Sequence, residues 1–342
     1  MKFYFAILLS AILFSCSNEK QKTETTAGEQ ASAPKMLGSL EKTDAALDAI
    51  ISPGAQAEVI AEGFDWSEGP LWLEKTKTLI WSDVPTNTIY KWTAEKGKEV
   101  YLTPSGYTDT AKRGGEMGSN GLTLDNEGNL ILCQHGNRQI AKMNSSVDDP
   151  KPVFTTLAGN YKGKRFSSPN DAIVSSTGEI YFTDPPYGLA KPEDKEQPYN
   201  GVYKIKKSGE VVLLVDSISR PNGIALFPGE KRLLVASSDD NKPIWYVYEL
   251  SDGGVGVKNG RIFYSAVGSD KSLKGLPDGL KIDKNGNVFA TGPGGIWIFN
   301  SEGKVLGKIK LNDPTSNCAL SPDEKTLYIT NDMNVLKLKM RD

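Results

Sequence analysis

The stretch Ser67-Glu68-Gly69-Pro70-Leu71-Trp72 begins a pattern that the chain repeats six times. In each repeat a polar residue leads into a short apolar strand, which is followed by a turn rich in Gly, Asn, Asp or Pro and by a second apolar strand. Each repeat therefore predicts a β-hairpin. The other five repeats begin at Ser119-Asn120-Gly121, Pro169-Asn170-Asp171, Pro221-Asn222-Gly223, Pro277-Asp278-Gly279 and Ser316-Asn317-Cys318.

The repeats are spaced like the blades of a β-propeller. Their polar residues stand at positions 68, 120, 170, 222, 278 and 317, so successive intervals are 52, 50, 52, 56 and 39 residues. These intervals suit four-stranded blades, and further apolar segments fall between the hairpins. We predict an all-β fold, a six-bladed β-propeller with four-stranded blades. An unrelated β-sandwich does not account for six polar residues at one phase of the repeat.

The ends of the repeat array predict how the ring closes. After Asn331 only one apolar stretch, residues 335–340, remains, so the sixth blade has three C-terminal strands. We expect its fourth strand to be Ala57–Gly63, which would join the two ends and remove an exposed sheet edge. The propeller domain would then span residues 51–342.

Residues 1–15 have the composition of a lipoprotein signal peptide. An apolar run from Phe3 to Phe14 follows Met1-Lys2 and has the length of a signal sequence rather than of a membrane span. The run ends at Leu13-Phe14-Ser15-Cys16, which resembles the bacterial lipobox. This resemblance implies that Cys16 is lipidated and becomes the first mature residue. The alternative is an ordinary cleaved signal with a chance cysteine.

Residues 16–50 would then carry the lipidated cysteine and a flexible tether, because most of them are small or polar. A short helix is expected within Ser39–Ile51. These features predict a protein that is lipid-anchored in a bacterial cell envelope and faces the periplasm or the cell surface. Its membrane contact would be through the N-terminal lipid only, and we expect a monomer.

The charge of the chain excludes one class of partner. A formal net charge of −2 and the lack of a basic run give no basis for binding nucleic acid. Cys133 and Cys318 belong to repeats two blades apart, so we predict free, buried thiols rather than a disulfide.

The six polar residues of the repeats predict a binding site on the propeller axis. The first strand of each blade lines the central channel, so residues at the start of that strand meet at one rim. Carboxylate and amide oxygens suit Ca²⁺, whereas a single histidine disfavours zinc or copper. Any one of these residues alone would be explained as a turn cap. The predicted rim ring is Glu68, Asn120, Asn170, Asn222, Asp278 and Asn317.

A second ring of residues is expected about fourteen or fifteen positions later, where each hairpin returns to the rim. His135, the only histidine, is either a catalytic or a structural residue. Asp184 and Tyr187 would shape the pocket or stabilise a loop, and Arg165 and Arg220 would bind substrate or be surface charges. The second ring comprises Asp83, His135, Asp184, Ser237, Thr291 and Asn331.

Four segments of the chain resemble the signatures of the senescence marker protein/gluconolactonase family. The likeness covers roughly residues 57–340, in the order expected of the family, whose propeller is shared by diisopropylfluorophosphatase and the paraoxonases. It implies that Glu68, Asn170, Asn222 and Asp278 hold one catalytic divalent cation. We expect Ca²⁺, although relatives also use Zn²⁺, Mn²⁺ or Mg²⁺, and the residue matching Asn170 sometimes contacts substrate instead. The four segments are Ser67-Glu68-Gly69-Pro70-Leu71-Trp72, Ser168-Pro169-Asn170-Asp171, Arg220-Pro221-Asn222-Gly223 and Leu276-Pro277-Asp278-Gly279.

The same resemblance implies a hydrolase that opens a sugar lactone. Asp278 is the first choice for the general base and His135 the second. The alternatives are hydrolysis of another ester or a phosphotriester at the same site, a noncatalytic envelope-anchored binding propeller, and a strictosidine-synthase-like propeller. A serine hydrolase lacks support because no Gly-x-Ser-x-Gly segment is present. The substrate contacts would come from Asn120, Arg165, Asp184, Tyr187 and Arg220.

Overall fold

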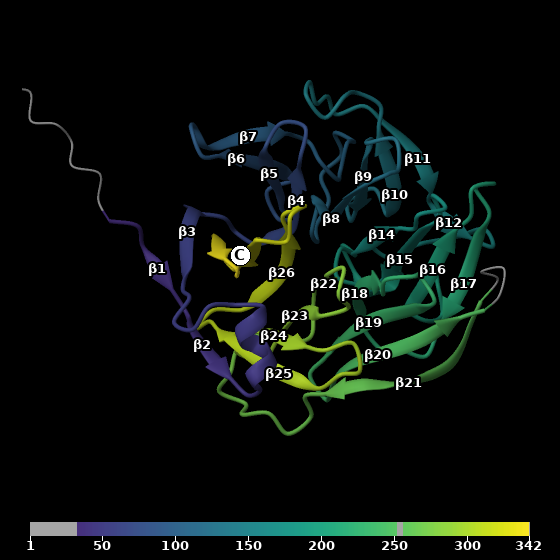
Figure 1. Cartoon of the computed structure of the whole chain (residues 1–342). Helices are drawn as coiled ribbons and strands as arrows, with labels where there is room; N and C mark the ends of the chain where they lie inside the picture. Colours follow the sequence, from purple (N-terminus) through teal and green to yellow (C-terminus); the bar gives the residue numbers. More distant parts are fainter. Residues whose placement is uncertain (1–32, 252–255, 342) are drawn as a thin grey trace, which may run out of the picture. The chain divides into compact units, whose positions relative to one another are not determined.

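The computed structural model describes residues 33–251 and 256–341, and its compact unit begins at Pro34. Six β-sheets surround a common axis in this unit, as Figure 1 shows. The helices in the described ranges are two short 3₁₀ helices, η1 (Ala45–Ala49) and η2 (Pro192–Asp194). No helix in these ranges has the length and apolar character needed to cross a membrane. The fold is a six-bladed β-propeller, as predicted.

The first four blades are each built from four consecutive antiparallel strands. A small hairpin between the second and third blades comprises β12 (Asn160–Tyr161) and β13 (Lys164–Arg165). The blade strands are β4 (Ser67–Leu73), β5 (Thr78–Asp83), β6 (Thr88–Thr93) and β7 (Gly97–Leu102); β8 (Ser119–Leu124), β9 (Leu130–Gln134), β10 (Gln139–Met143) and β11 (Phe154–Ala158); β14 (Ala172–Val174), β15 (Ile180–Asp184), β16 (Gly201–Ile205) and β17 (Val211–Val215); and β18 (Pro221–Leu226), β19 (Arg232–Asp239), β20 (Lys242–Leu250) and β21 (Val257–Ser265).

The last two blades include strands from the N-terminal part of the compact unit. In the sixth blade β3 pairs antiparallel with β28, with Ala61 opposite Val335, so the predicted closure of the ring is confirmed. The fifth blade comprises β22 (Leu280–Ile282), β23 (Val288–Gly292), β24 (Gly295–Phe299) and β25 (Val305–Lys310). The sixth comprises β26 (Thr315–Leu320), β27 (Thr326–Asn331), β28 (Asn334–Lys339) and β3 (Ala57–Glu62).

The residues just before β3 form structure where a tether was expected. β1 (Met36–Leu37) adds a fifth strand to the sixth blade, and β2 (Ser39–Lys42) adds one to the fifth. The short helix expected within Ser39–Ile51 is present as the 3₁₀ helix η1, while Ser39–Lys42 forms β2. Leu47 of η1 is fully buried in the apolar cluster of the last two blades. The compact unit therefore starts near residue 34 instead of 51, while residues 1–15 and Cys16 lie outside the described ranges.

The inner strands β4, β8, β14, β18, β22 and β26 contact one another around the axis. In β4, β8 and β18 a glycine stands just after the rim residue, and this glycine allows the next blade to come close. A Cβ atom there would lie 2.2 Å from a backbone oxygen of the next blade at Gly69, 2.7 Å at Gly121 and 2.1 Å at Gly223. The Gly-containing repeat thus brings neighbouring rim residues together.

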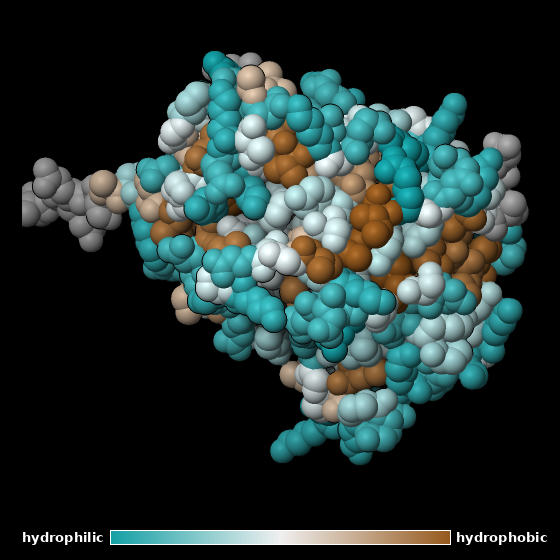
Figure 2. All heavy atoms as spheres, turned by 90° about the horizontal axis from the view of Figure 1, so that it is seen from below, coloured by the Kyte–Doolittle hydropathy of each residue, from teal (hydrophilic) through white to brown (hydrophobic). Residues whose placement is uncertain are grey.

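Buried side chains fill the spaces within and between the blades, and the thiols belong to this interior. Cys133 and Cys318 are buried and free, as predicted. The surface is largely polar: hydrophilic side chains cover most of the face in Figure 2, with apolar patches between them. Such a distribution is ordinary for a folded domain.

Candidate active site

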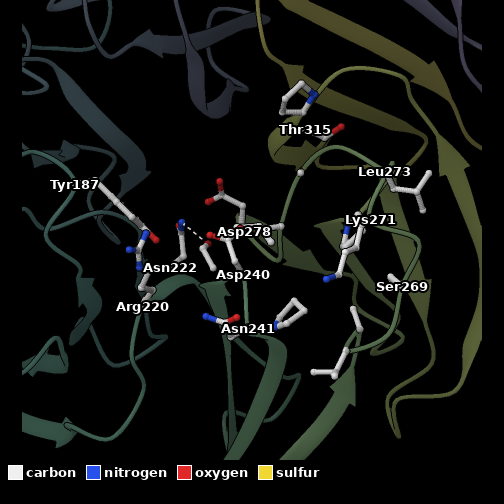
Figure 3. Close-up of a pocket in the computed structure, with 18 of the residues that line it drawn as sticks. Tyr187, Arg220, Asn222, Asp240, Asn241, Ser269, Lys271, Leu273, Asp278 and Thr315 are labelled. Atoms are coloured by element: carbon white, nitrogen blue, oxygen red, sulfur yellow. Dashed lines mark hydrogen bonds between the residues drawn. The ribbon is translucent and has the colours of Figure 1, made fainter.

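A cavity of about 850 Å³ lies where the inner strands begin; we call it the axial cavity. Tyr187 and Arg220 lie on one side of it, and Asp278 lies between them and the loop 266–276, which carries Lys271 (Figure 3). Five of the six rim residues predicted from the sequence line the axial cavity: Glu68, Asn120, Asn170, Asn222 and Asp278.

Two carboxylates of the axial cavity lie close enough to affect each other. Oε2 of Glu68 accepts hydrogen bonds from the Gly69 N–H at 2.9 Å and from Asn317 Nδ2 at 3.2 Å. Burial nevertheless raises the pKa of Glu68 to about 8, and nearby Asp171 contributes. Burial and then the charge of Glu68 raise the pKa of Asp278 well above its usual value. A cation between the two carboxylates would offset both effects.

The two asparagines of the predicted ligand set present amide oxygens. Nδ2 of Asn222 donates to Ser238 Oγ at 2.9 Å (dashed in Figure 3), which leaves Oδ1 as the atom available to a ligand. The backbone N–H of Asn170 is bonded to the Thr183 carbonyl at 2.8 Å. Oδ1 of Asn170 is buried and has no hydrogen-bond partner among the described residues.

This donor set fits a hard divalent cation. Oδ1 of Asp278, like Oδ1 of Asn170, is a buried oxygen with no hydrogen-bond partner in the described ranges. Such atoms are rare in folded proteins and need an explanation, and carboxylate and amide oxygens are the ligands that Ca²⁺ prefers. No group of three or more His, Cys, Asp or Glu side chains in residues 33–251 and 256–341 is placed to hold a metal. The amide oxygens of Asn170 and Asn222 are therefore needed to complete a site.

Asn317, the sixth predicted rim residue, does not line the axial cavity. Its Nδ2 donates to Glu68, and its Oδ1 accepts the N–H of Cys318 at 2.9 Å. Both ends of the amide are thus used within the protein, and Asn317 orients the Glu68 carboxylate.

The structure places His135 behind the wall of the axial cavity rather than in it. The side chain is fully buried, and Nδ1 lies 2.8 Å from Oε2 of Glu116. His135 therefore cannot touch a substrate in the cavity, which corrects its prediction as a second-choice base.

Two further residues predicted to contact substrate lie away from the axial cavity. The carboxylate of Asp184 accepts the backbone N–H groups of Ser167 at 2.9 Å and Ser168 at 2.7 Å. Arg165 is exposed and donates from Nη2 to the Asn137 carbonyl at 3.1 Å. Asp184 thus supports the loop before Asn170, and Arg165 ties two loops together.

Tyr187 and Arg220 do line the axial cavity, as expected. The Tyr187 hydroxyl is buried close to the side chains of Ser238 and Asn222. Burial and then the charge of Asp278 raise the pKa of Tyr187 above its usual value. The hydroxyl therefore stays protonated and can donate a hydrogen bond.

Comparison with known proteins identifies the family. The sequence model of the SMP-30/Gluconolactonase/LRE-like region matches residues 66–332. The chain belongs to this family. The resemblance noted in its sequence is therefore confirmed, and the match covers all six of the repeats that line the axis.

Several proteins of known name are similar to this chain over most of its length. A gluconolactonase of Zymomonas mobilis is 40% identical over 317 residues, which are 89% of this chain and 87% of the relative. A pentonolactonase of Haloferax volcanii is 21% identical, with 77% and 80% covered. The solved structure of a gluconolactonase from Xanthomonas campestris superposes with a TM-score of 0.76 at 29% identity, covering 91% of this chain and 99% of that one.

Several residues of this family member that line the axial cavity were not predicted. Trp66 and Glu116 line it, as does the loop 266–276 with Lys271. They lie outside the repeated hairpins, so the search for repeats could not find them. For Glu116 the one available signal was its position four residues before the rim residue Asn120.

Proposed function

We propose that this protein is a divalent-cation-dependent lactonase that opens a sugar lactone. The observation that carries this proposal is the convergence of Glu68, Asn170, Asn222 and Asp278 on one cavity, where Oδ1 of Asn170 and Oδ1 of Asp278 find no hydrogen-bond donor among the described residues. The gluconolactonase that is 40% identical across nearly the whole chain supports the same activity. The relatives do not favour a phosphotriesterase or a noncatalytic propeller.

Glu68, Asn170, Asn222 and Asp278 would hold the cation, and Ca²⁺ is the ion that their oxygen atoms suit best; Zn²⁺, Mn²⁺ and Mg²⁺ are the alternatives. Once bound, the cation supplies a Lewis acid for the lactone carbonyl. Asn317 keeps the Glu68 carboxylate in place through its hydrogen bond of 3.2 Å.

We assign Asp278 as the group that accepts a proton from the attacking water. Its carboxylate lines the axial cavity, so one of its oxygens would hold the cation while the other accepts the proton. Tyr187 and Arg220 would donate hydrogen bonds to the substrate, and Trp66 offers an apolar surface to a sugar ring.

The test of this function is hydrolysis of glucono-1,5-lactone, corrected for spontaneous opening, with and without a chelator. We expect chelation to abolish turnover and Ca²⁺ to restore it. Asp278→Asn should lower kcat by about 100-fold or more. Asp216→Asn, at an exposed position, is the matched control. Full activity in the chelator, or in the Asp278 variant, would refute the proposal.

We also propose that Cys16 is lipidated, that the protein is a monomer anchored in a bacterial cell envelope, and that it contacts the membrane through this lipid only. The sequence Leu13-Phe14-Ser15-Cys16 and the polar residues after it support this. Mass spectrometry of the membrane fraction should find a lipid on the mature N-terminus. In detergent phase separation, a Cys16→Ser variant should move from the detergent phase to the aqueous phase. Light scattering of the purified protein should give the mass of a monomer.

A further inference from the structure

A third carboxylate, Glu116, reaches the axial cavity from the loop 103–118. Its side chain is 36% exposed, and its Oε2 lies 2.8 Å from Nδ1 of His135. Within the described ranges no hydrogen bond reaches Oε1. One oxygen of Glu116 is therefore fixed by the protein, and the other is free for a molecule in the cavity.

The partner of Glu116 is a histidine that no substrate can reach. The His135 side chain is 0% exposed, and Gly188 packs against it so closely that a Cβ atom there would lie 2.7 Å from His135 Cβ. Nε2 of His135 has no hydrogen-bond partner among the described residues, so the contact with Glu116 is the one that holds the ring. The buried imidazole thus orients the carboxylate and nothing else.

The loop that carries Glu116 is anchored at several points. Oδ1 of Asn87 accepts the backbone N–H groups of Ser105, Gly106 and Tyr107 at 2.7–3.2 Å. Arg113 donates to the carbonyls of Gly136 at 2.6 Å and Gly188 at 2.5 Å. A carboxylate on such a loop is held in place before any ligand arrives, which is the property of a recognition residue.

Glu116 lies near enough to the proposed cation ligands for its charge to add to burial in raising the pKa of both Glu68 and Asp278. Among the described residues, no three acidic side chains form a metal-binding group, so Glu116 does not join Glu68 and Asp278 in one. Burial opposes its ionisation, but the hydrogen bond and charge of His135 outweigh this and lower the pKa of Glu116. Glu116 therefore remains an anionic hydrogen-bond acceptor beside the cation site.

A second acceptor comes from the same part of the chain. Asn120, at the start of β8, is 4% exposed and lines the axial cavity. Its buried Oδ1 has no hydrogen-bond partner in the part of the chain that the structure describes. Two fixed acceptors that line the same cavity call for a ligand that brings donors, and the ring hydroxyls of a sugar lactone are donors.

We propose that Glu116 binds the ring hydroxyls of the lactone and selects polyhydroxylated lactones over unsubstituted ones, with His135 as its positioning residue. This inference rests on the proposed lactonase function, because it names what the same cavity recognises. The group that distinguishes the substrates is thus separate from the groups that open the ester.

The test compares kcat/KM for glucono-1,5-lactone with kcat/KM for δ-valerolactone, which has the ring ester but no hydroxyls. Glu116→Gln keeps the size of the side chain and removes its charge, and should lower the ratio of the two values about ten-fold, mainly through KM for the sugar lactone. The inhibition constant of 1,5-anhydroglucitol, which has the ring hydroxyls without the carbonyl, should rise to a similar extent. Glu95→Gln, at an exposed position, should change neither value.

His135 is tested by a pair of variants. His135→Leu removes the donor and should reproduce the rise in KM seen for Glu116→Gln, whereas His135→Asn keeps an N–H near Nδ1 and should restore most of the loss. Thermal unfolding of both variants checks that they are folded. If His135→Leu does not fold, the Glu116 variant and the inhibitor still decide the matter.

Two outcomes distinguish this inference from the proposed function. A wild-type protein that opens no lactone refutes the function itself. An active wild type whose substrate ratio is unchanged in Glu116→Gln overturns only the assignment of Glu116, and so does an equal loss on both lactones.

Discussion

Two backbone N–H groups, those of Ser167 and Ser168, meet the carboxylate of Asp184 at 2.9 and 2.7 Å. These residues precede Asn170, one of the proposed cation ligands, so Asp184 acts on the site through the loop it holds. Burial raises the pKa of Asp184 to about 7 even though both hydrogen bonds favour the charged form. The loop that positions Asn170 is thus held by a carboxylate whose burial is unfavourable for its charged form.

The raised pKa of Asp184 predicts a change of stability with pH. The carboxyl binds its proton more tightly in the folded protein, with a pKa of about 7, than in the unfolded chain, where the value is near 3.8. The contribution of the Asp184 carboxyl to the free energy of unfolding is therefore at its maximum below about pH 4. It falls as the pH rises from about 4 to about 7 and does not change further above about pH 7. Asp184→Asn removes this titration.

Urea unfolding of the wild type and of Asp184→Asn between pH 4.5 and 8.5 measures the effect. The stability difference, wild type minus variant, should decrease up to about pH 7. Other buried acids titrate in both proteins and cancel in the difference. A difference that does not vary with pH would contradict this account of Asp184.

Most of the cavity residues that the sequence predicted follow the repeat, and Tyr187 and Arg220 were predicted from their positions beside it. Glu68, Asn222 and Asp278 share one phase of six hairpins, so their meeting could be inferred from spacing. Glu116 belongs to a loop without periodicity, and whether a loop residue points inward depends on contacts such as those of Asn87 and Arg113. His135 was expected at the rim, but its hydrogen bond to Glu116 is tertiary and leaves no pattern in the sequence.

At the scale of the elements, β1, β2 and η1 form one segment that crosses the outer edges of two blades. β2 pairs with β25 from Ser39 opposite Lys310 to Lys42 opposite Gly307, and β1 pairs with β3. Both strands are short, and alternation over two or four residues is too brief to predict a strand. Their pairing depends on the blade edges next to them, so composition alone suggested a tether.

The burial of Leu47 predicts that this segment stabilises the propeller. The side chain is 0% exposed and packs with Ile51, Leu306 and Ile309. Leu47→Ala should lower the free energy of unfolding by about 2–5 kcal/mol, because it leaves a cavity in this cluster. Chemical denaturation measures the loss.

Val153→Ala is the control for this experiment. Val153 is 56% exposed, and its truncation should change stability by no more than about 0.5 kcal/mol. If Leu47→Ala changed the free energy of unfolding as little as Val153→Ala, η1 would not be part of the core.

At the scale of the whole compact unit, the ring depends on pairing between the two ends of the repeat array. β3 covers β28 from Glu62 opposite Asn334 to Glu58 opposite Lys337. The six hairpins and this closing strand were predictable because each blade leaves a sheet face that only its neighbours can bury. The sequence could not show the fifth strands of the last two blades, which no repeat requires.

Truncation tests the closure. A chain that begins at residue 34 keeps β1, β2 and β3 and should unfold in a single cooperative transition, with lactonase activity. A chain that begins at residue 63 lacks all three strands, leaves β28 as an open edge and should lose that transition and aggregate. Circular dichroism and calorimetry compare the two chains. A shorter chain that melts like the longer one would refute the role of β3.

The path of the N-terminal segment across the outer edges also determines how the propeller responds to tension. Any pull transmitted through residues 33–35 reaches β1 first, which is held to β3 by a pairing of two residues, and then β2. These short pairings can peel away before the load reaches β3 and the ring. We therefore expect stretching from residue 33 to separate β1 and β2 from the blades before it disturbs β3 and the axial cavity.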